Sequence, residues 1–278
     1  MTGETTSHPA GAAAGADPGR GYTHIVRAQR ISVSFGNIRA LSDIDLAIGR
    51  NEIVGLIGDN GAGKSTLTKV LTGVLRPTSG RLFIRDQPID WNQYSVRAAH
   101  RLRFETVYQE KSLGEKQPLW RNFFVGRQIT NRWGFIKVRE ERRIADEILK
   151  RHIGFRGVGI DADSTVSQLS GGERQGIAIG RAMYFDSDLI LLDEPTVALA
   201  VKEVQKVLDF VRSIKRSGRA CIYIEHNLAH VHALADRLVV LDRGRIVADI
   251  PAGTMSLEEL TRFLIGLHAP AGAAGAAQ

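Results

Sequence analysis

The octapeptide from Gly58 to Ser65, GDNGAGKS, constrains this chain more than any other stretch of its sequence. It follows the apolar run Ile53–Ile57, which predicts a buried parallel strand. It precedes Ser65–Leu75, where apolar residues recur at helical spacing. A strand, a glycine-rich loop and a helix, in that order, form the context in which such a sequence cradles phosphate. The alternative, a glycine-rich turn before an ordinary helix, does not require these flanks. We therefore expect a nucleotide-binding α/β domain.

The residue types in the loop predict separate roles. Glycines let backbone N–H groups turn inward around phosphate, and the helix N-terminus adds its positive dipole end. Lys64 is expected to reach the β and γ oxygens, and the Ser65 hydroxyl to ligate Mg²⁺. The remaining cradle positions are Gly58, Asn60, Gly61, Ala62 and Gly63.

A second candidate phosphate site lies in Leu169–Gln175, LSGGERQ. The chain passes through Gly171 and Gly172 into a helix predicted to start near Glu173. N–H groups and the Ser170 hydroxyl are thereby offered at a positive helix end. Alone, the pattern also fits a simple helix cap with a flexible lead-in.

An acidic pair follows the second glycine motif. The apolar stretch 188–192 predicts a strand that delivers Asp193 and Glu194 at its carboxyl end, where open α/β sheets gather their ligands. The alternative is a solvated loop start. The order of the three motifs favours a site.

With these motifs in this order, the chain resembles the ATP-binding subunits of ABC transporters over about Ile25–Leu267. The resemblance implies an α/β fold: a P-loop NTPase cassette with a RecA-like core, an antiparallel β subdomain and an inserted helical lobe. It implies a domain at 22–268, with the lobe at about 110–168. The flanking tails, 1–21 and 269–278, are rich in small residues and are expected to be disordered.

Family roles transfer to the matching residues as expectations. Gln109 matches the Q-loop, a metal ligand near the reacting phosphate, and Asp193 lies in the outer shell of the metal. Glu194 matches the group that orients and deprotonates water, and His226 the switch histidine that contacts the γ-phosphate. Three further matches are Thr66 in the phosphate loop, the Ser170–Gly172 motif, which closes the ATP site of the opposite chain, and Phe35, which stacks on adenine or is simply part of the core.

One departure concerns the segment after Glu194. Most of the superfamily has aspartate where this chain has Ala200, and that aspartate normally links two nucleotide sites across a dimer. Four short segments nevertheless resemble the sugar-importer branch, especially ribose/fructose-type subunits with a single cassette. They are AVKE at 200–203, GDN at 58–60, ETVYQ at 105–109 and HNL at 226–228. We read the alanine as a lineage feature.

The resemblance implies ATP and Mg²⁺ as cofactors and a set of partners. One phosphate loop and one signature motif per chain predict two chains at the ATP sites, as a homodimer or cassette heterodimer. An integral membrane permease would be the direct partner and an external solute-binding protein an indirect one, with the chain peripheral at the cytoplasmic face of a bacterial-type inner membrane. Trp120, Phe123 and Phe124 fit either a permease-docking groove or the lobe core.

Composition leaves two rival functions open. A net charge of +7 and a pI near 9.7 motivate a soluble ABC ATPase acting on nucleic acid or the ribosome. Such proteins carry tandem cassettes or long coiled-coil insertions, so we expect no nucleic-acid partner. A regulatory module without turnover is opposed by Glu194 and His226.

The remaining sequence features favour ordinary structural roles. The spacing of His226, His230 and His232 lacks the further ligands of a zinc site. Cys221 is expected to be a buried small hydrophobe. Residues 1–21 lack the pattern of a signal peptide, and no run is long enough to span a bilayer.

Overall fold

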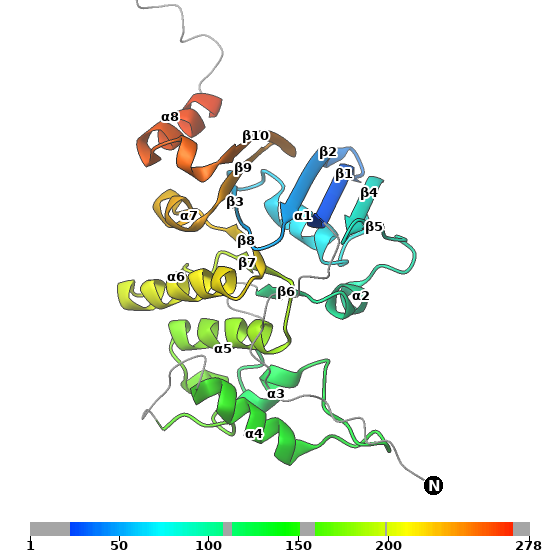
Figure 1. Ribbon diagram of the computed structural model, residues 1–278, viewed down its shortest axis with the longest axis vertical. Helices are drawn as coiled ribbons and strands as arrows, with labels where there is room; N and C mark the ends of the chain where they lie inside the picture. Colours follow the sequence, from blue (N-terminus) through cyan, green and yellow to red (C-terminus); the bar gives the residue numbers. More distant parts are fainter. Residues whose placement is uncertain (1–22, 108–112, 151–158, 198, 269–278) are drawn as a thin grey trace, which may run out of the picture.

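The computed structural model describes residues 23–107, 113–150, 159–197 and 199–268. The expectations for the terminal tails and for Gln109 lie outside the described residues. The chain forms two sheets with helices between and below them (Figure 1). The predicted cassette fold is confirmed by this combination of a mixed main sheet, an antiparallel sheet and a helical lobe.

The smaller sheet is antiparallel and is built around a long hairpin. Its strand order is β2 (Ile38–Gly49), β1 (His24–Phe35), β4 (Ser79–Ile84) and β5 (Gln87–Pro88). Buried and exposed residues alternate along β2, as a sheet with one face on the core requires. The antiparallel β subdomain that the resemblance implies is confirmed.

Within the part of the chain that the structure describes, the main sheet has six strands, and five of them run parallel. In spatial order they are β10 (Arg245–Pro251), β9 (Arg237–Asp242), β3 (Ile53–Ile57), β8 (Ala220–Ile224), β7 (Leu189–Asp193) and β6 (Phe104–Val107). Every residue of β3 and of β8 is buried, because each strand has a neighbour on both sides and a packed layer on both faces. Among the strands of the described residues in this sheet, β10 alone is antiparallel to its neighbour, β9.

Helices cover both faces of the main sheet. In chain order they are α1 (Lys64–Leu71), α2 (Val96–Arg101), α6 (Val201–Arg216), α7 (Leu228–Leu234) and α8 (Leu257–His268). Alternate residues of β3 enter different cores: Val54 and Leu56 pack with α1 and the small sheet, whereas Ile53 and Ile57 pack with α6, α7 and α8. The phosphate-loop strand is thus the shared wall of two apolar clusters.

The helical lobe contains α3 (Leu119–Phe124) and α4 (Val138–Ile148), and α5 (Gly171–Tyr184) packs against both. Its own core holds Trp120, Phe123 and Phe124, which are at most 6% exposed. The docking-groove alternative is therefore wrong for these three aromatic side chains. Their burial follows from α3, which is short and inserts nearly all of its residues between α4 and α5.

Two smaller expectations can be compared with the structure. Cys221 is fully buried in β8, where burial raises the pKa of its thiol, so the prediction of a small buried hydrophobe is confirmed. None of the described helices has the length and apolar character that crossing a bilayer demands.

The junction between sheet and lobe contains a histidine with an abnormal pKa. Burial, together with the guanidinium groups of Arg127 and Arg181, lowers the pKa of His100 to about 4. The unfolded chain binds a proton near the ordinary pKa of about 6.5, whereas the folded chain does not. Proton uptake by the unfolded state should therefore reduce the free energy of unfolding as pH falls from about 6.5 to 4.

We expect replacement of His100 to flatten part of this pH dependence. In His100→Gln the difference in melting temperature between pH 7 and pH 5 should be smaller than in the wild type, because one proton-binding difference is gone. Thermal denaturation at both pH values measures this. An equal or larger pH effect in the variant would contradict the assignment, and the half-buried His230 on α7 serves for a control replacement.

Candidate nucleotide site

The phosphate loop connects β3 to α1, and its glycines are required by close backbone approach. Gly58 has φ 157°, and a Cβ there would lie 2.2 Å from the carbonyl oxygen of Leu241. Gly63 has φ 110°, and its Cβ would lie 2.8 Å from the carbonyl oxygen of Ala40. The loop is therefore held between β9 and β2, and larger residues at these two positions would push it outward.

Lys64 is folded back into the loop. Its Nζ donates hydrogen bonds to the carbonyl oxygens of Gly58 at 2.5 Å and of Asp59 at 3.0 Å, and the residue is only 7% exposed. Burial lowers the pKa of Lys64, while the carboxylates of Glu194 and Asp193 counter that shift. A partly desolvated ammonium beside backbone N–H groups is suited to hold phosphate oxygens.

The register of the main sheet brings the acidic residues to this loop. Ile224 on β8 pairs with Leu56 on β3 and with Asp193 on β7. The carboxyl ends of three neighbouring strands therefore lie level, and the residues that follow them share one edge. Burial, and then the neighbouring Glu194 carboxylate, raises the pKa of Asp193, which Lys64 and His226 partly offset.

Glu194 and His226 form the most specific contact at this edge. The Nε2 atom of His226 lies 2.7 Å from Oε1 of Glu194, within hydrogen-bonding distance. Glu194 adopts φ 50°, a left-handed conformation that is rare outside glycine, and its N–H donates to the carbonyl oxygen of Ile224 at 2.9 Å. Such strain is found where a side chain must be aimed, and here it directs Glu194 toward His226.

Two supporting residues were not assigned a role from the sequence. The carboxylate of Glu225, 3% exposed, accepts hydrogen bonds from the Thr196 hydroxyl and, at 2.9 Å, from the backbone N–H of His226. Glu225 thus ties the segment after Glu194 to the segment that carries His226. The sequence does show that Glu225 directly follows an apolar strand, which is a signal for a site residue. The resemblance assigned a role only to the next residue, His226.

The signature motif lies in a different part of the chain. Ser170 caps α5 in a reciprocal arrangement: its Oγ accepts from the Glu173 N–H at 3.3 Å, and the Glu173 carboxylate accepts from the Ser170 N–H at 2.8 Å. The predicted helix start near Glu173 is earlier, at Gly171. In Figure 1, α1 lies in the upper half of the molecule and α5 in the lower half beside α3 and α4.

Phe35 ends β1 and is 52% exposed, so the alternative that it belongs to the core is wrong. It lies on the small sheet whose strand β2 contacts Gly63 through Ala40 and Leu41. Adenine stacking by Phe35 stays a prediction.

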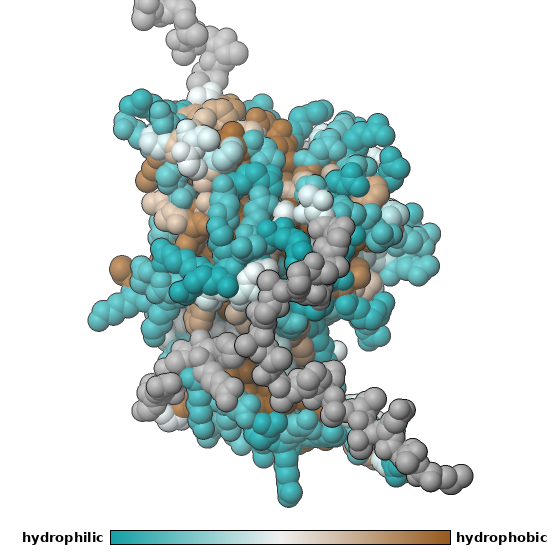
Figure 2. All heavy atoms as spheres, in the orientation of Figure 1, coloured by the Kyte–Doolittle hydropathy of each residue, from teal (hydrophilic) through white to brown (hydrophobic). Residues whose placement is uncertain are grey.

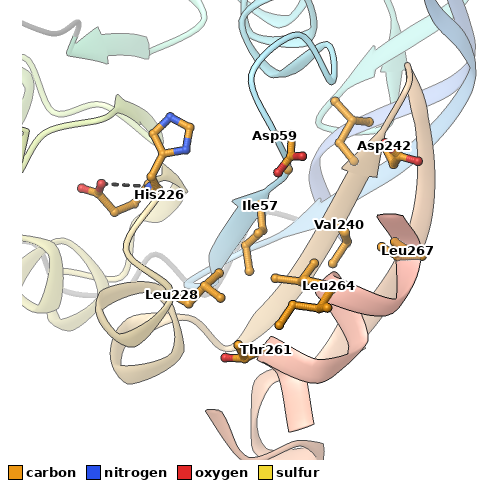
Figure 3. Close-up of a pocket in the computed structure, with 13 residues that line it drawn as sticks. Ile57, Asp59, His226, Leu228, Val240, Asp242, Thr261, Leu264 and Leu267 are labelled. Carbon is orange, nitrogen blue, oxygen red and sulfur yellow. Dashed lines mark hydrogen bonds between the residues drawn. The ribbon is translucent and has the colours of Figure 1, made fainter. Parts of the chain in front are cut away.

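A cavity of about 250 Å³ adjoins the loop on the side of α8. Figure 3 shows apolar residues from β3, β9 and α8 along it, with His226 at its border and the imidazole ring directed away from Leu264. Lys64, Ser65, Asp193 and Glu194 are not among its lining residues. Gly58 and Asp59 of the phosphate loop do line it, together with His226, so the cavity borders the loop on the side of α8. Figure 2 shows apolar surface over α8 and β10 in the same region.

The donor set at the loop fits Mg²⁺. Ser65 is exposed at the start of α1, and Asp193 lies at the same sheet edge, so a hydroxyl and a carboxylate oxygen are available to a hard cation. Within the described part of the chain, no three His, Cys, Asp or Glu side chains are arranged to hold a metal by themselves. Mg²⁺ bound with phosphate and water oxygens needs no such cluster.

The profile of the ABC transporter family matches residues 41–197, from β2 through the acidic pair. The chain belongs to the ABC transporter family. The recognition made from the motifs is thereby confirmed. Among curated relatives, the xylose/arabinose import ATP-binding protein XylG of Sulfolobus acidocaldarius is 37% identical over 83% of this chain and 90% of its own length.

Two further comparisons agree with this assignment. The ribose import ATP-binding protein RbsA 3 of Rubrobacter xylanophilus is 35% identical over 87% of this chain, which spans only 48% of that longer protein. Among solved structures, the ATP-binding cassette MJ1267 in its ADP conformation superposes with a TM-score of 0.71 at 25% identity. The match covers 87% of this chain and 95% of that one.

The departure at Ala200 has a local structural consequence in this cassette. Ala200 is the N-cap of α6 and has no side-chain oxygen to accept from the first turn of the helix. The Glu203 carboxylate instead accepts from the Ala200 N–H at 3.2 Å. The start of α6 therefore has one of the two hydrogen bonds of a reciprocal cap, the one that Glu203 accepts.

Glu203 also contacts the signature motif. A Cβ on Gly172 would lie 2.7 Å from both Cβ and Cγ of Glu203, so these two residues are in direct van der Waals contact. Hydrogen bonding from Ser170, and then from the Ala200 backbone, lowers the pKa of the Glu203 carboxyl. The starts of α5 and α6 are thus packed together through a residue with no side chain.

We expect Gly172→Ala to be destabilising by about 1–3 kcal/mol, the range for overpacking a closed contact. Gly171→Ala is the matched control, because its Cβ would meet only the Cδ2 end of Leu199 at 3.0 Å, which can rotate away. Urea unfolding of both variants measures the difference. Equal free energies of unfolding for the two variants would contradict the prediction, because they would show that Glu203 can move away from an added methyl group at little cost.

Proposed function

We propose that this chain is the ATPase subunit of an importer for a sugar or similar small polar solute, binding and hydrolysing ATP at an interface between two cassettes. The observation that carries the proposal is the contact between Glu194 and His226 at the edge that also holds the phosphate loop. The named relatives support the import role, since they are import ATP-binding proteins for pentoses.

Nucleotide binding rests on the loop and its lysine. The backbone from Gly58 to Gly63 surrounds the phosphates, and Lys64 exchanges its carbonyl partners for phosphate oxygens. Ser65 and Gln109 would hold Mg²⁺, with Asp193 in its outer shell. When bound, that ion neutralises charge on the transferring phosphoryl group. Thr66 and Phe35 are proposed to contact the phosphates and adenine.

Hydrolysis is assigned to Glu194 and His226. Glu194 orients a water molecule and accepts its proton, as a carboxylate at this edge can do. His226 hydrogen-bonds Glu194 and is positioned to contact the γ-phosphate. Glu225 keeps that histidine in place by accepting from its backbone N–H. The water attacks phosphorus, and the bond to the β–γ bridging oxygen breaks.

A second chain completes the site in this proposal. The positions of α1 and α5 in separate halves of the molecule support this arrangement, in which the signature residues Ser170, Gly171 and Gly172 contact phosphate held by the loop of another chain (Figure 1). A homodimer or cassette heterodimer places them opposite the loop of the other chain. ATP would then hold two chains together until hydrolysis releases them.

The proposed direct partner is an integral membrane permease, with an external solute-binding protein acting through it. The chain would lie peripherally at the cytoplasmic face of the membrane. The import relatives favour this role over the nucleic-acid alternative, because none of the reported names refers to a nucleic acid or the ribosome.

We expect Lys64→Ala to weaken ATP binding about tenfold to a hundredfold, since a charge-assisted contact contributes roughly 1.5–3 kcal/mol. Lys69→Ala is the control, because Lys69 lies on the same helix and is exposed. Titration with a fluorescent ATP analogue measures both affinities. Near-normal binding by Lys64→Ala would contradict the assignment of the loop.

We expect Glu194→Gln to leave ATP affinity unchanged and to slow phosphate release by about 10²–10⁴-fold, the range for losing a general base. With ATP and Mg²⁺, the variant should elute as a dimer. The control is Glu258→Gln, an exposed acid on α8. Unchanged turnover in Glu194→Gln would overturn the catalytic role, and turnover that depends on added RNA would favour the nucleic-acid alternative.

A further inference from the structure

A short hairpin in the lobe presents aromatic side chains to solvent. It comprises residues 130–136, between α3 and α4, and is called the aromatic hairpin here. Thr130 and Ile136 form an antiparallel bridge, and the Asn131 N–H donates to the carbonyl oxygen of Phe135 at 2.9 Å. The Asn131 side-chain oxygen accepts from the N–H groups of Trp133 at 2.9 Å and Phe135 at 3.0 Å. The tip is therefore a hydrogen-bonded turn with a defined conformation.

The exposed apolar surface of the hairpin is unusual for this lobe. Trp133 and Phe135 are each 71% exposed, and Ile136 is 46% exposed. By contrast, Trp120 and Phe123 are buried a few residues earlier in the chain. Large apolar side chains that remain together in water mark an interaction surface, because exposing them is unfavourable.

Basic residues surround the aromatic side chains. The stretch from Val125 to Arg139 contains four basic residues and no acidic one. Arg127 pairs with Glu105, and Lys137 with Glu140 at 3.2 Å. Arg132 and Arg139 are exposed, and the Arg132 guanidinium lies 5.0 Å from the centre of the Trp133 ring. The surface thus combines aromatic rings with positive charge.

We propose that the aromatic hairpin binds the surface of an anionic phospholipid bilayer, with Trp133 and Phe135 in the interfacial region and Arg132 and Arg139 against phosphate headgroups. Aromatic rings favour that depth, and basic side chains are attracted to anionic lipid. In Figure 1 the segment between α3 and α4 runs out from the side of the lobe. A projecting tip suits a soft bilayer surface, whereas a protein partner would need a matching hollow.

This binding goes beyond the proposed function, and it requires neither permease nor ATP turnover. It can therefore fail while the ATPase assignment stands, and the reverse also holds. It would add a second point of attachment beside the permease and restrict the orientation of the lobe toward the membrane.

The test is cosedimentation of the full chain with vesicles of phosphatidylglycerol and phosphatidylcholine, and with vesicles of phosphatidylcholine alone. Wild type should bind the anionic vesicles, and Trp133→Ser/Phe135→Ser should bind them about tenfold more weakly, since affinity scales with buried apolar area. The affinity of Arg132→Gln/Arg139→Gln for the anionic vesicles should fall roughly fivefold for each charge removed. All variants should keep the wild-type melting temperature, because the replaced side chains are exposed.

Ile38→Ser is the matched control, because Ile38 is 72% exposed and lies on the small sheet. It should bind anionic vesicles like the wild type. Brominated lipid should quench tryptophan fluorescence in the wild type and much less in Trp133→Ser. Of the two tryptophans left in that variant, Trp120 is buried in the lobe and Trp91 is half-buried against the core of the small sheet.

Three results would overturn the proposal. They are absence of wild-type binding to anionic vesicles, equal binding by the wild type and the double aromatic variant, and an equal loss in Ile38→Ser. If the aromatic variant binds vesicles normally but no longer retains a membrane protein in detergent, the hairpin docks on protein and the lipid assignment is wrong.

Discussion

Pairing of β8 with strands on both sides is the constraint on which the candidate site depends. Ile224 is level with Leu56 on one side and with Asp193 on the other, so three chain segments leave the sheet at the same height. A shift of one residue in the β7–β8 pairing would displace Glu194 from His226, and a shift in the β3–β8 pairing would displace both from the phosphate loop. Either shift would also exchange the side chains that face the two cores. Complete burial of β3 and β8 opposes such a shift, because each residue packs in one of two cores.

A buried ion cluster connects this sheet to the lobe. Glu105 on β6, 3% exposed, pairs with Arg127 from the lobe and lies 3.9 Å from Arg181 on the signature helix. Burial raises the pKa of Glu105, and the two guanidinium groups counter that shift. Removing one member would leave uncompensated buried charge, which is strongly destabilising. The lobe and the β6 edge are therefore mechanically joined just before the segment that contains Gln109.

The sequence supported those predictions that depend on local pattern. The phosphate loop, the strand before it and the strand that ends at the acidic pair could all be located, because glycine spacing and apolar runs are local signals. The contact of Gly172 with Glu203 could not, since it arises from the packing of α5 on α6. The burial of Trp120 could not be predicted either. A short apolar helix is compatible with a core and with a surface groove, and the packing of α4 and α5 against it decides between them. Glu225 was visible in the sequence, but only its contact with Thr196 indicates a positioning role.

The position of Cys221 has a practical consequence. It is the one cysteine in the sequence, and it lies fully buried in β8. Thiol reagents attack the thiolate, which burial suppresses at this position by raising the pKa. A cysteine introduced on the lobe and another on the small sheet could therefore carry a pair of fluorescent dyes, with the native thiol left intact. The distance between the lobe and the small sheet could then be measured without first replacing Cys221.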